Sequence, residues 1–269
     1  MGKQILKLSV LVFTLGILTA CQTTSDSSTK SIGSQGSPVS KSDYDKQKAA
    51  QVRLSAGLQY LRSGSLQNAK RHLDKALALG ADSGNVHFGI AYYYEQVKEF
   101  EKAEKSYKKA LRIDSKNPDF LNGYASFLCG RGQYEKSDRY FNKAIEQPVY
   151  PDVASAFVNA GVCAKQNGDR DKAAGYFRKA LNRNNKFPLA LIEMAETEFD
   201  KKRYRRAFSY IKRYEEVSRP TANSLWLALR VAHHQKDKNA IASYAIKLEQ
   251  MFPDSEETAA FLDSRDQWM

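Results

Sequence analysis

Few side chains in this chain of 269 residues are suited to covalent or metal chemistry, which here means three cysteines and four histidines. No two histidines have the i, i+4 spacing with which a helix presents paired zinc ligands, and the cysteines lack a metal-ligand spacing. The sequence has neither a GxSxG nucleophile motif nor a glycine-rich phosphate loop. We therefore expect a protein that is not an enzyme and that has no metal site, no cofactor and no small-molecule substrate.

Cys21 is the cysteine with the clearest chemical context. A short apolar run precedes it, and Lys3 and Lys7 lie before that run. The run is too short for a transmembrane helix, which needs about 20 apolar residues, and the order of charges and apolar residues is typical of a secretory signal. The run ends in LTAC (18–21), which resembles the lipobox of bacterial lipoproteins, where the cysteine thiol carries a lipid and the chain is cut before it. This implies a lipoprotein signal peptide over residues 1–20 and lipidation of Cys21. The alternative is an ordinary signal peptide with a chance cysteine.

The segment after Cys21 is polar. Residues 22–42 are mostly Ser, Thr, Gly and Gln, which cannot bury enough apolar surface to offset the entropy of ordering them. We expect residues 21–48 to form a flexible tether. Gln22 follows the cysteine. An Asp there tends to retain Gram-negative lipoproteins at the inner membrane, so the resemblance implies a lipid-anchored protein on the periplasmic face of the outer membrane.

The chain is basic, with 42 Lys and Arg against 30 Asp and Glu and a formal net charge of +12. Most of these cations alternate with acids at helical spacing, which is typical of a solvated surface. One dense basic run stands out, DKKRYRR (200–206). We interpret the charge as a solvated surface and expect no nucleic-acid partner, because an exported protein does not normally meet DNA.

From about residue 43 onward the chain repeats a pattern of small and bulky residues with a period close to 34. One series of small residues is followed four positions later by a bulky residue, and a second series lies 12 positions before the first. The first series is Ala69, Ala103, Ser137, Ala173, Ala207 and Ala240; the bulky residues are Leu73, Tyr107, Phe141, Phe177, Ile211 and Tyr244; the second series is Gly57, Ala91, Ala125, Gly161, Ala195 and Ala228.

Short polar breaks such as RSGS (62–65) separate the two series, so each repeat predicts a helix, a tight turn and a second helix. A 34-residue unit of this kind is the tetratricopeptide repeat (TPR). We predict an all-α fold, a right-handed superhelix of about six TPR units over residues 49–254. A C-terminal capping helix is expected over 255–269, because a terminal repeat has no outer neighbour. The two prolines of QPVYPD (147–152) predict a longer loop between units three and four.

The first helix of each unit is expected to line a groove, with the residues three before, one after and four after the small residue directed into it. In the first two units five of these six positions are apolar and the sixth is Glu95. An exposed apolar stripe marks a partner site. The predicted groove becomes more polar in the middle units. Alternatively, residues 43–49 fold back and cover the leucines. The residues predicted to line the apolar part are Leu54, Leu58, Leu61, Phe88 and Tyr92.

Cys129 and Cys163 form an even pair on the first helices of units three and four. Neighbouring first helices pack side by side in a TPR array, and an exported protein folds where disulfides persist. A bridge needs Cα atoms about 4.4–6.8 Å apart, which such helices can reach. We predict a Cys129–Cys163 disulfide, with two buried free thiols as the alternative.

The lipobox, the polar tether and six TPR units with a cysteine pair resemble one family as a whole, the type IV pilus biogenesis lipoproteins called PilF or PilW. The segments that carry the resemblance are Cys21, YLRSGSLQNAKRHLDKAL (60–77) and FLCGRGQYEKSDRYFNKAI (127–145). The resemblance implies a pilotin, which binds secretin subunits (PilQ in this family) and promotes their outer-membrane localisation and multimerisation. A membrane-anchored TPR adaptor for peptidoglycan-processing enzymes is the alternative.

Overall fold

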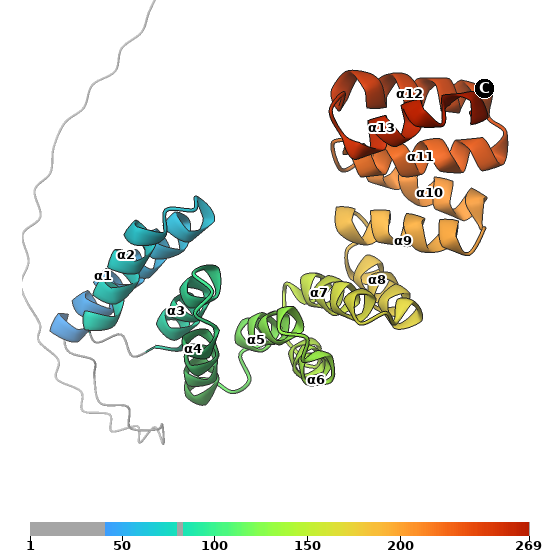
Figure 1. Ribbon diagram of the computed structural model, residues 1–269. Helices are drawn as coiled ribbons and strands as arrows, with labels where there is room; N and C mark the ends of the chain where they lie inside the picture. Colours follow the sequence, from blue (N-terminus) through green and yellow to red (C-terminus); the bar gives the residue numbers. More distant parts are fainter. Residues whose placement is uncertain (1–40, 80–82, 269) are drawn as a thin grey trace, which may run out of the picture. The chain divides into compact units, whose positions relative to one another are not determined.

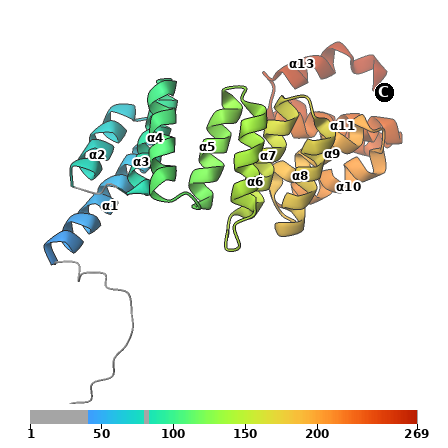
Figure 2. The same ribbon diagram turned by 90° about the horizontal axis from the view of Figure 1, so that it is seen from below.

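The computed structural model describes residues 41–79 and 83–268, and this part of the chain is α-helical (Figure 1). Its helices follow one another as hairpins (Figure 2). They are α1 (Lys41–Arg62), α2 (Leu66–Ala78), α3 (Gly84–Gln96), α4 (Phe100–Ile113), α5 (Pro118–Gly130), α6 (Tyr134–Ile145), α7 (Val153–Gln166), α8 (Arg170–Arg183), α9 (Pro188–Asp200), α10 (Tyr204–Glu215), α11 (Ala222–Gln235), α12 (Lys238–Met251), α13 (Glu256–Asp263) and the 3-10 turn η1 (Arg265–Gln267).

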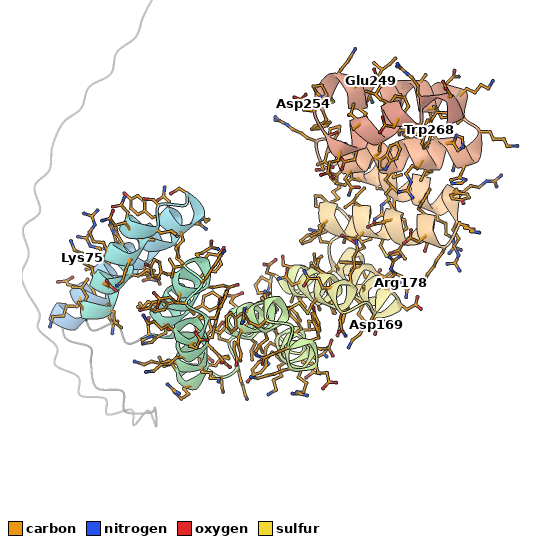
Figure 3. The ribbon with its side chains drawn as sticks, in the orientation of Figure 1. Lys75, Asp169, Arg178, Glu249, Asp254 and Trp268 are labelled. Atoms are coloured by element: carbon orange, nitrogen blue, oxygen red, sulfur yellow. A yellow bond between two sulfur atoms is a disulfide. The ribbon has the colours of Figure 1, made fainter. Side chains whose placement is uncertain are left out.

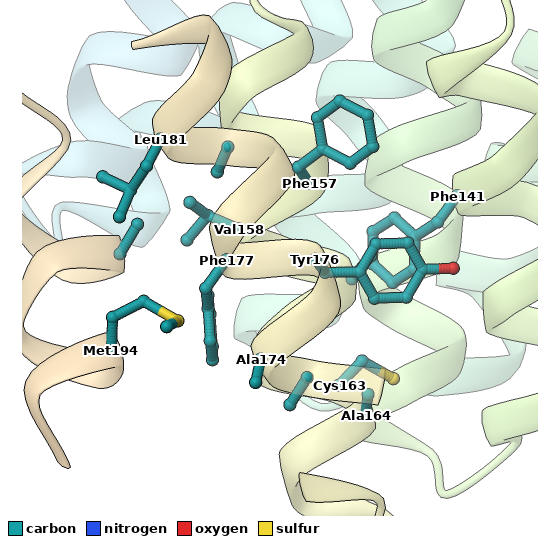
Figure 4. Packing of buried hydrophobic residues seen from close by; sticks show 14 of the residues in the cluster. Phe141, Phe157, Val158, Cys163, Ala164, Ala174, Tyr176, Phe177, Leu181 and Met194 are labelled. Carbon is teal, nitrogen blue, oxygen red and sulfur yellow. The ribbon is translucent and has the colours of Figure 1, made fainter. Parts of the chain in front are cut away.

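Helices α1 to α12 form six pairs, each with a first and a second helix, and each pair also packs against the next along the chain. The TPR prediction is therefore confirmed. All six small residues of the first helices are buried, as are five of the six in the second helices; the sixth, Ala240, is half-buried. Neighbouring pairs share apolar clusters. The largest runs from α5 to α10, and Figure 4 shows Phe141, Tyr176, Phe177 and Met194 in it.

The bulky residue of each second helix packs with the small residue of the first helix in the same unit, by direct contact where the small residue is glycine and within one apolar cluster in the other four units. A Cβ added to Gly161 would lie 2.6 Å from a ring atom of Phe177, and one added to Gly57 would lie 2.9 Å from Cγ of Leu73. Phe177 is 1% exposed and Leu73 is 2% exposed, so neither side chain has free space beside it. The 34-residue period of the sequence therefore reflects a contact between the two helices of a unit that recurs in every unit.

The turn between the two helices of every unit contains one residue with positive φ. In three units it is glycine, at Gly64, Gly132 and Gly168, where the left-handed conformation carries no steric cost. In the other three it is a lysine with φ near 60°, and the sequence there shows no glycine signal. These residues are Lys98, Lys202 and Lys236.

Local signals fix where many of the helices begin. Asn117 accepts hydrogen bonds from the backbone N–H groups of Asp119 and Phe120, directly before Pro118 at the start of α5. Asp169, labelled in Figure 3, accepts one from the backbone N–H of Lys172 at 3.0 Å. These contacts satisfy backbone donors that have no partner within the helix.

The loop between α6 and α7 contains both prolines of QPVYPD, as expected. Tyr150 in this loop is 8% exposed and packs in a cluster with Leu121 of α5, Ala144 of α6 and Ala156 of α7. The longer loop therefore adds a buried aromatic side chain between units three and four.

Both ends of the array differ from the expected boundaries. Helix α1 begins at Lys41, so the prediction of a tether up to residue 48 is wrong for residues 41–48. This stretch lacks glycine and proline, and its Lys and Gln residues favour helix even though the side chains of 44–49 are exposed. Residues 43–49 therefore extend α1 and do not fold back over its leucines. The closing helix α13 is short, and the ring of Trp268 after it lies 5.2 Å from that of Trp226 in α11 (Figure 3).

The close contact at Gly161 gives a test of the packing. Gly161→Ala is expected to lower the free energy of unfolding by about 1–3 kcal/mol, because the new methyl group overlaps the buried ring of Phe177. Denaturant unfolding followed by circular dichroism measures the change.

Gly175 supplies the matched control. It lies inside α8, and a Cβ added there would meet nothing within 4 Å. Gly175→Ala is expected to raise the free energy of unfolding by about 0.5–1 kcal/mol, since alanine favours helix. Equal effects of the two substitutions would contradict the packing argument.

Candidate functional site

The structure separates the five residues of the predicted apolar groove into buried and accessible ones. Leu54 and Leu61 are 8% and 5% exposed and belong to the core of α1, α2 and α3. The prediction that these two line an open groove is wrong, because their side chains fill the space between α1 and its neighbours. Leu58 and Phe88 are half-buried, and Tyr92 is 38% exposed.

Leu58, Phe88 and Tyr92 lie on the neighbouring first helices α1 and α3. A Cβ added to Gly89 of α3 would meet Leu54 at 2.9 Å and Leu58 at 3.4 Å, so this glycine lets the two helices approach closely. Tyr92 follows Phe88 by one helical turn and therefore lies on the same side of α3. The surface available to a partner here is smaller than the sequence predicts, and Tyr92 is its most exposed member.

Phe88 also connects the first helices of units two and three. Its ring stacks on that of Phe120 with centroids 5.2 Å apart, and its edge occupies the space beside Gly123, where an added Cβ would lie 2.4 Å away. Phe88 therefore packs against unit three, while it is only half-buried and lies one helical turn before Tyr92.

A half-buried carboxylate lies one turn beyond Tyr92. Glu95 Oε2 accepts a hydrogen bond of 2.7 Å from the hydroxyl of Tyr107 in α4. Burial raises the pKa of the Glu95 carboxyl above its ordinary value, and the hydrogen bond from Tyr107 offsets part of that shift. The sequence predicted Glu95 on the groove face but gave no sign of its partner, which lies 12 residues later on the second helix.

The middle units carry polar contacts between successive first helices, in line with the predicted change in character. Asn159 of α7 donates a hydrogen bond of 3.2 Å to Asn122 of α5. Lys165 of α7 lies 2.7 Å from a carboxylate oxygen of Glu193 and 2.7 Å from one of Glu196, both in α9. These side chains pair with each other along the array, so polar contacts interrupt the apolar surface after unit two on this face.

Cys129 of α5 and Cys163 of α7 form a disulfide in the structure, with Cα atoms 5.8 Å apart. Both are nearly buried. Ser137 of α6 lies beside them: its hydroxyl donates to the carbonyl of Ala125 at 2.7 Å and lies 3.4 Å from the sulfur of Cys163. This bond explains why a serine occurs at a position that is alanine in the other five units. The disulfide links units three and four across the long loop.

Cys21 and the predicted signal peptide lie outside the described residues, so lipidation stays a prediction. Within residues 41–79 and 83–268, no group of three or more His, Cys, Asp or Glu side chains is placed to hold a metal ion. In the same part of the chain, no helix is both long and apolar enough to cross a membrane.

Family models match two overlapping parts of the chain. A model of YpiA-like C-terminal tetratricopeptide repeats matches residues 85–149, and a general tetratricopeptide repeat model matches residues 128–188. Among curated proteins, the chain is similar to the type IV pilus assembly protein PilF of Pseudomonas aeruginosa, with 31% identity over 254 residues, 94% of this chain and 97% of PilF.

Comparison with solved structures also finds type IV pilus proteins. P. aeruginosa PilF superposes with a TM-score of 0.74 and 30% identity over 82% of this chain and 99% of that one. The crystal structure of PilW, described as a widely conserved type IV pilus biogenesis factor, superposes with a TM-score of 0.69 and 28% identity over 79% of this chain and 98% of that one.

The disulfide gives a prediction that mass spectrometry can test. In protein isolated without reductant, Cys129 and Cys163 are expected to resist alkylation, and both react after reduction and unfolding. The bridge closes a loop with a sequence separation of 34, so replacing both cysteines by alanine is expected to lower the free energy of unfolding by about 3–4 kcal/mol. Two alkylated thiols in the unreduced protein would contradict this.

Proposed function

Because the chain belongs to the PilF/PilW family of type IV pilus assembly proteins, we propose that it acts as a pilotin. In this proposal it binds secretin subunits (PilQ-like) and promotes their localisation and multimerisation in the outer membrane. The observation that carries the proposal is the 31% identity to PilF along 94% of the chain, with the same repeat fold. The shared part is the whole repeat array, so the inherited role is that of a non-enzymatic assembly factor that binds other proteins.

The anchor in this mechanism is the lipid on Cys21. Its support is the LTAC motif after a short apolar run, together with Gln22 in place of aspartate. Two or more acyl chains hold a protein on a membrane stably. A lipid-anchored array carries its bound partner to the membrane to which the lipoprotein is delivered. In this way a protein without catalytic activity can direct assembly.

The binding surface in this mechanism is the accessible part of α1 and α3. Tyr92 is exposed there, the half-buried Phe88 precedes it by one helical turn on α3, and the half-buried Leu58 lies on the neighbouring helix α1. Large aromatic residues near the centre of an interface contribute strongly to binding energy. A short segment of a secretin subunit would cover Tyr92 and the exposed edges of the two apolar residues.

A charge at Tyr92 tests the binding surface. Tyr92→Glu is expected to weaken binding of a purified secretin periplasmic domain by about tenfold or more, because the partner would have to bury a carboxylate. Titration calorimetry measures the affinity, and circular dichroism checks that helix content is unchanged. Ile113→Glu is the control, since Ile113 is also exposed but lies at the end of the second helix α4. Equal affinities of the two variants would contradict this surface.

Loss of the thiol tests the anchor. In a Cys21→Ala strain, the protein is expected to leave the outer-membrane fraction, and heat-stable secretin multimers are expected to stay at the inner membrane. Membrane fractionation with immunoblotting measures both, beside a strain that lacks the gene. Normal multimers at the outer membrane in both strains, with binding of the protein to purified sacculi, would instead support the peptidoglycan adaptor.

A further inference from the structure

A basic hollow of about 770 Å³ lies where the turn between α9 and α10 meets the end of α11, far along the chain from the surface on α1 and α3. It coincides with the dense basic run of the sequence. The residues that line it are Lys202, Arg203, Tyr204, Arg205, Arg206, Phe208, His234, Gln235 and Asp237. Asp237 is the one acid among them, and its side chain accepts the backbone N–H of Ala240 as the cap of α12.

A buried carboxylate lies near two of the arginines. Glu198 of α9 is 5% exposed, and its Oε2 lies 3.7 Å from Arg203 Nη1 and 4.0 Å from Arg206 Nη1. The side chains of Arg203 and Arg206 nevertheless remain 53% and 70% exposed. A guanidinium group has five N–H donors, so each arginine faces Glu198 with one part and keeps further donors available to solvent. Both distances are too long for a hydrogen bond, so the two arginines keep their N–H donors for an anion.

The other two cations of the hollow have no acidic partner. No carboxylate of the described residues lies within 4.0 Å of the charged groups of Lys202 or Arg205, whereas the preceding Lys201 pairs with Asp171 at 2.7 Å. The positive charge of Lys202 also contributes to the lowered pKa of His234. Burial, followed by the positive charges of His233, Arg230 and Lys202, lowers the pKa of His234 below its ordinary value. The hollow is therefore a region of net positive charge.

An aromatic surface lies beside these cations. The rings of Tyr204 and His234 stack with centroids 4.2 Å apart and an interplanar angle of 5°, and Phe199 packs against both with centroids 5.6 Å away. Phe208 lines the hollow as well. Stacked rings offer a rigid apolar face at low entropic cost, next to groups that bind carboxylates.

We propose that this hollow binds an acidic peptide segment of a protein partner, at a second site separate from the surface on α1 and α3. Carboxylates of the segment pair with Lys202 and Arg205 and with the outward N–H groups of Arg203 and Arg206, and its apolar side chains lie on the Tyr204–His234 stack. A peptide segment can enter a hollow and reach the cations that line it. A flat membrane surface would instead contact cations that protrude from the protein, so the hollow favours the peptide over a bilayer.

The test uses the full-length protein and two charge variants. The probe is a short fluorescein-labelled peptide in which pairs of glutamates alternate with phenylalanine, with glutamine in place of each glutamate in the control peptide. Lys202→Glu/Arg205→Glu is expected to weaken binding of the acidic peptide at least tenfold in fluorescence anisotropy. These two residues are chosen because the fold does not use them in ion pairs, and Arg205→Ala is a milder variant in case the double one unfolds.

The matched control is Lys105→Glu/Arg112→Glu on α4, which changes the net charge by the same amount at two exposed positions. It is expected to bind the acidic peptide as the unmodified protein does. Equal weakening by both double variants, or equal binding of the glutamine peptide, would overturn the proposal. The proposal would also be overturned if Lys202→Glu/Arg205→Glu lost binding to phosphatidylglycerol vesicles but kept binding to the peptide. The hollow would then bind a membrane.

Discussion

The array depends on one repeated contact, in which a bulky side chain of each second helix lies on a small residue of the first. Where the small residue is glycine, as at Gly161 and Gly57, even a methyl group would overlap the neighbouring side chain. This contact sets the distance between the two helices of a unit. Because each unit in such an array touches only its neighbours, the same local constraint repeated six times builds the whole domain.

The same constraint limits what remains for binding partners. In the first unit, the residues three before and four after the small residue, Leu54 and Leu61, are buried in the core that α1 shares with α2 and α3. The position directly after the small residue is not fully buried in the first five units, where it is occupied by leucine, tyrosine, serine, valine and glutamate in turn. The residue at this position therefore contributes to the chemistry of the face in each of these units, and it differs from unit to unit.

The sequence predicted the features that repeat, because the same residue types recur at a fixed spacing and can be recognised by comparing the units. It predicted the small and bulky residues, and it placed Cys129 and Cys163 on adjacent first helices. It did not show the start of α1 at Lys41, where polar helix-forming residues look like a tether by composition. Nor did it show the left-handed turn residue in three units, since Lys98 and its counterparts take a conformation that is usually signalled by glycine.

The basic hollow escaped the sequence for a different reason, which also explains how one array can hold two dissimilar surfaces. As a run of letters, DKKRYRR has the composition of a solvated turn. Its geometry depends on Glu198, which precedes the turn and is buried, and on His234, which comes from the next unit. The buried acid and the exposed arginines near it belong to one unit, and the stacked ring of His234 belongs to its neighbour. The contacts that form such a site are therefore confined to two neighbouring units, and they do not change the apolar surface of the first units.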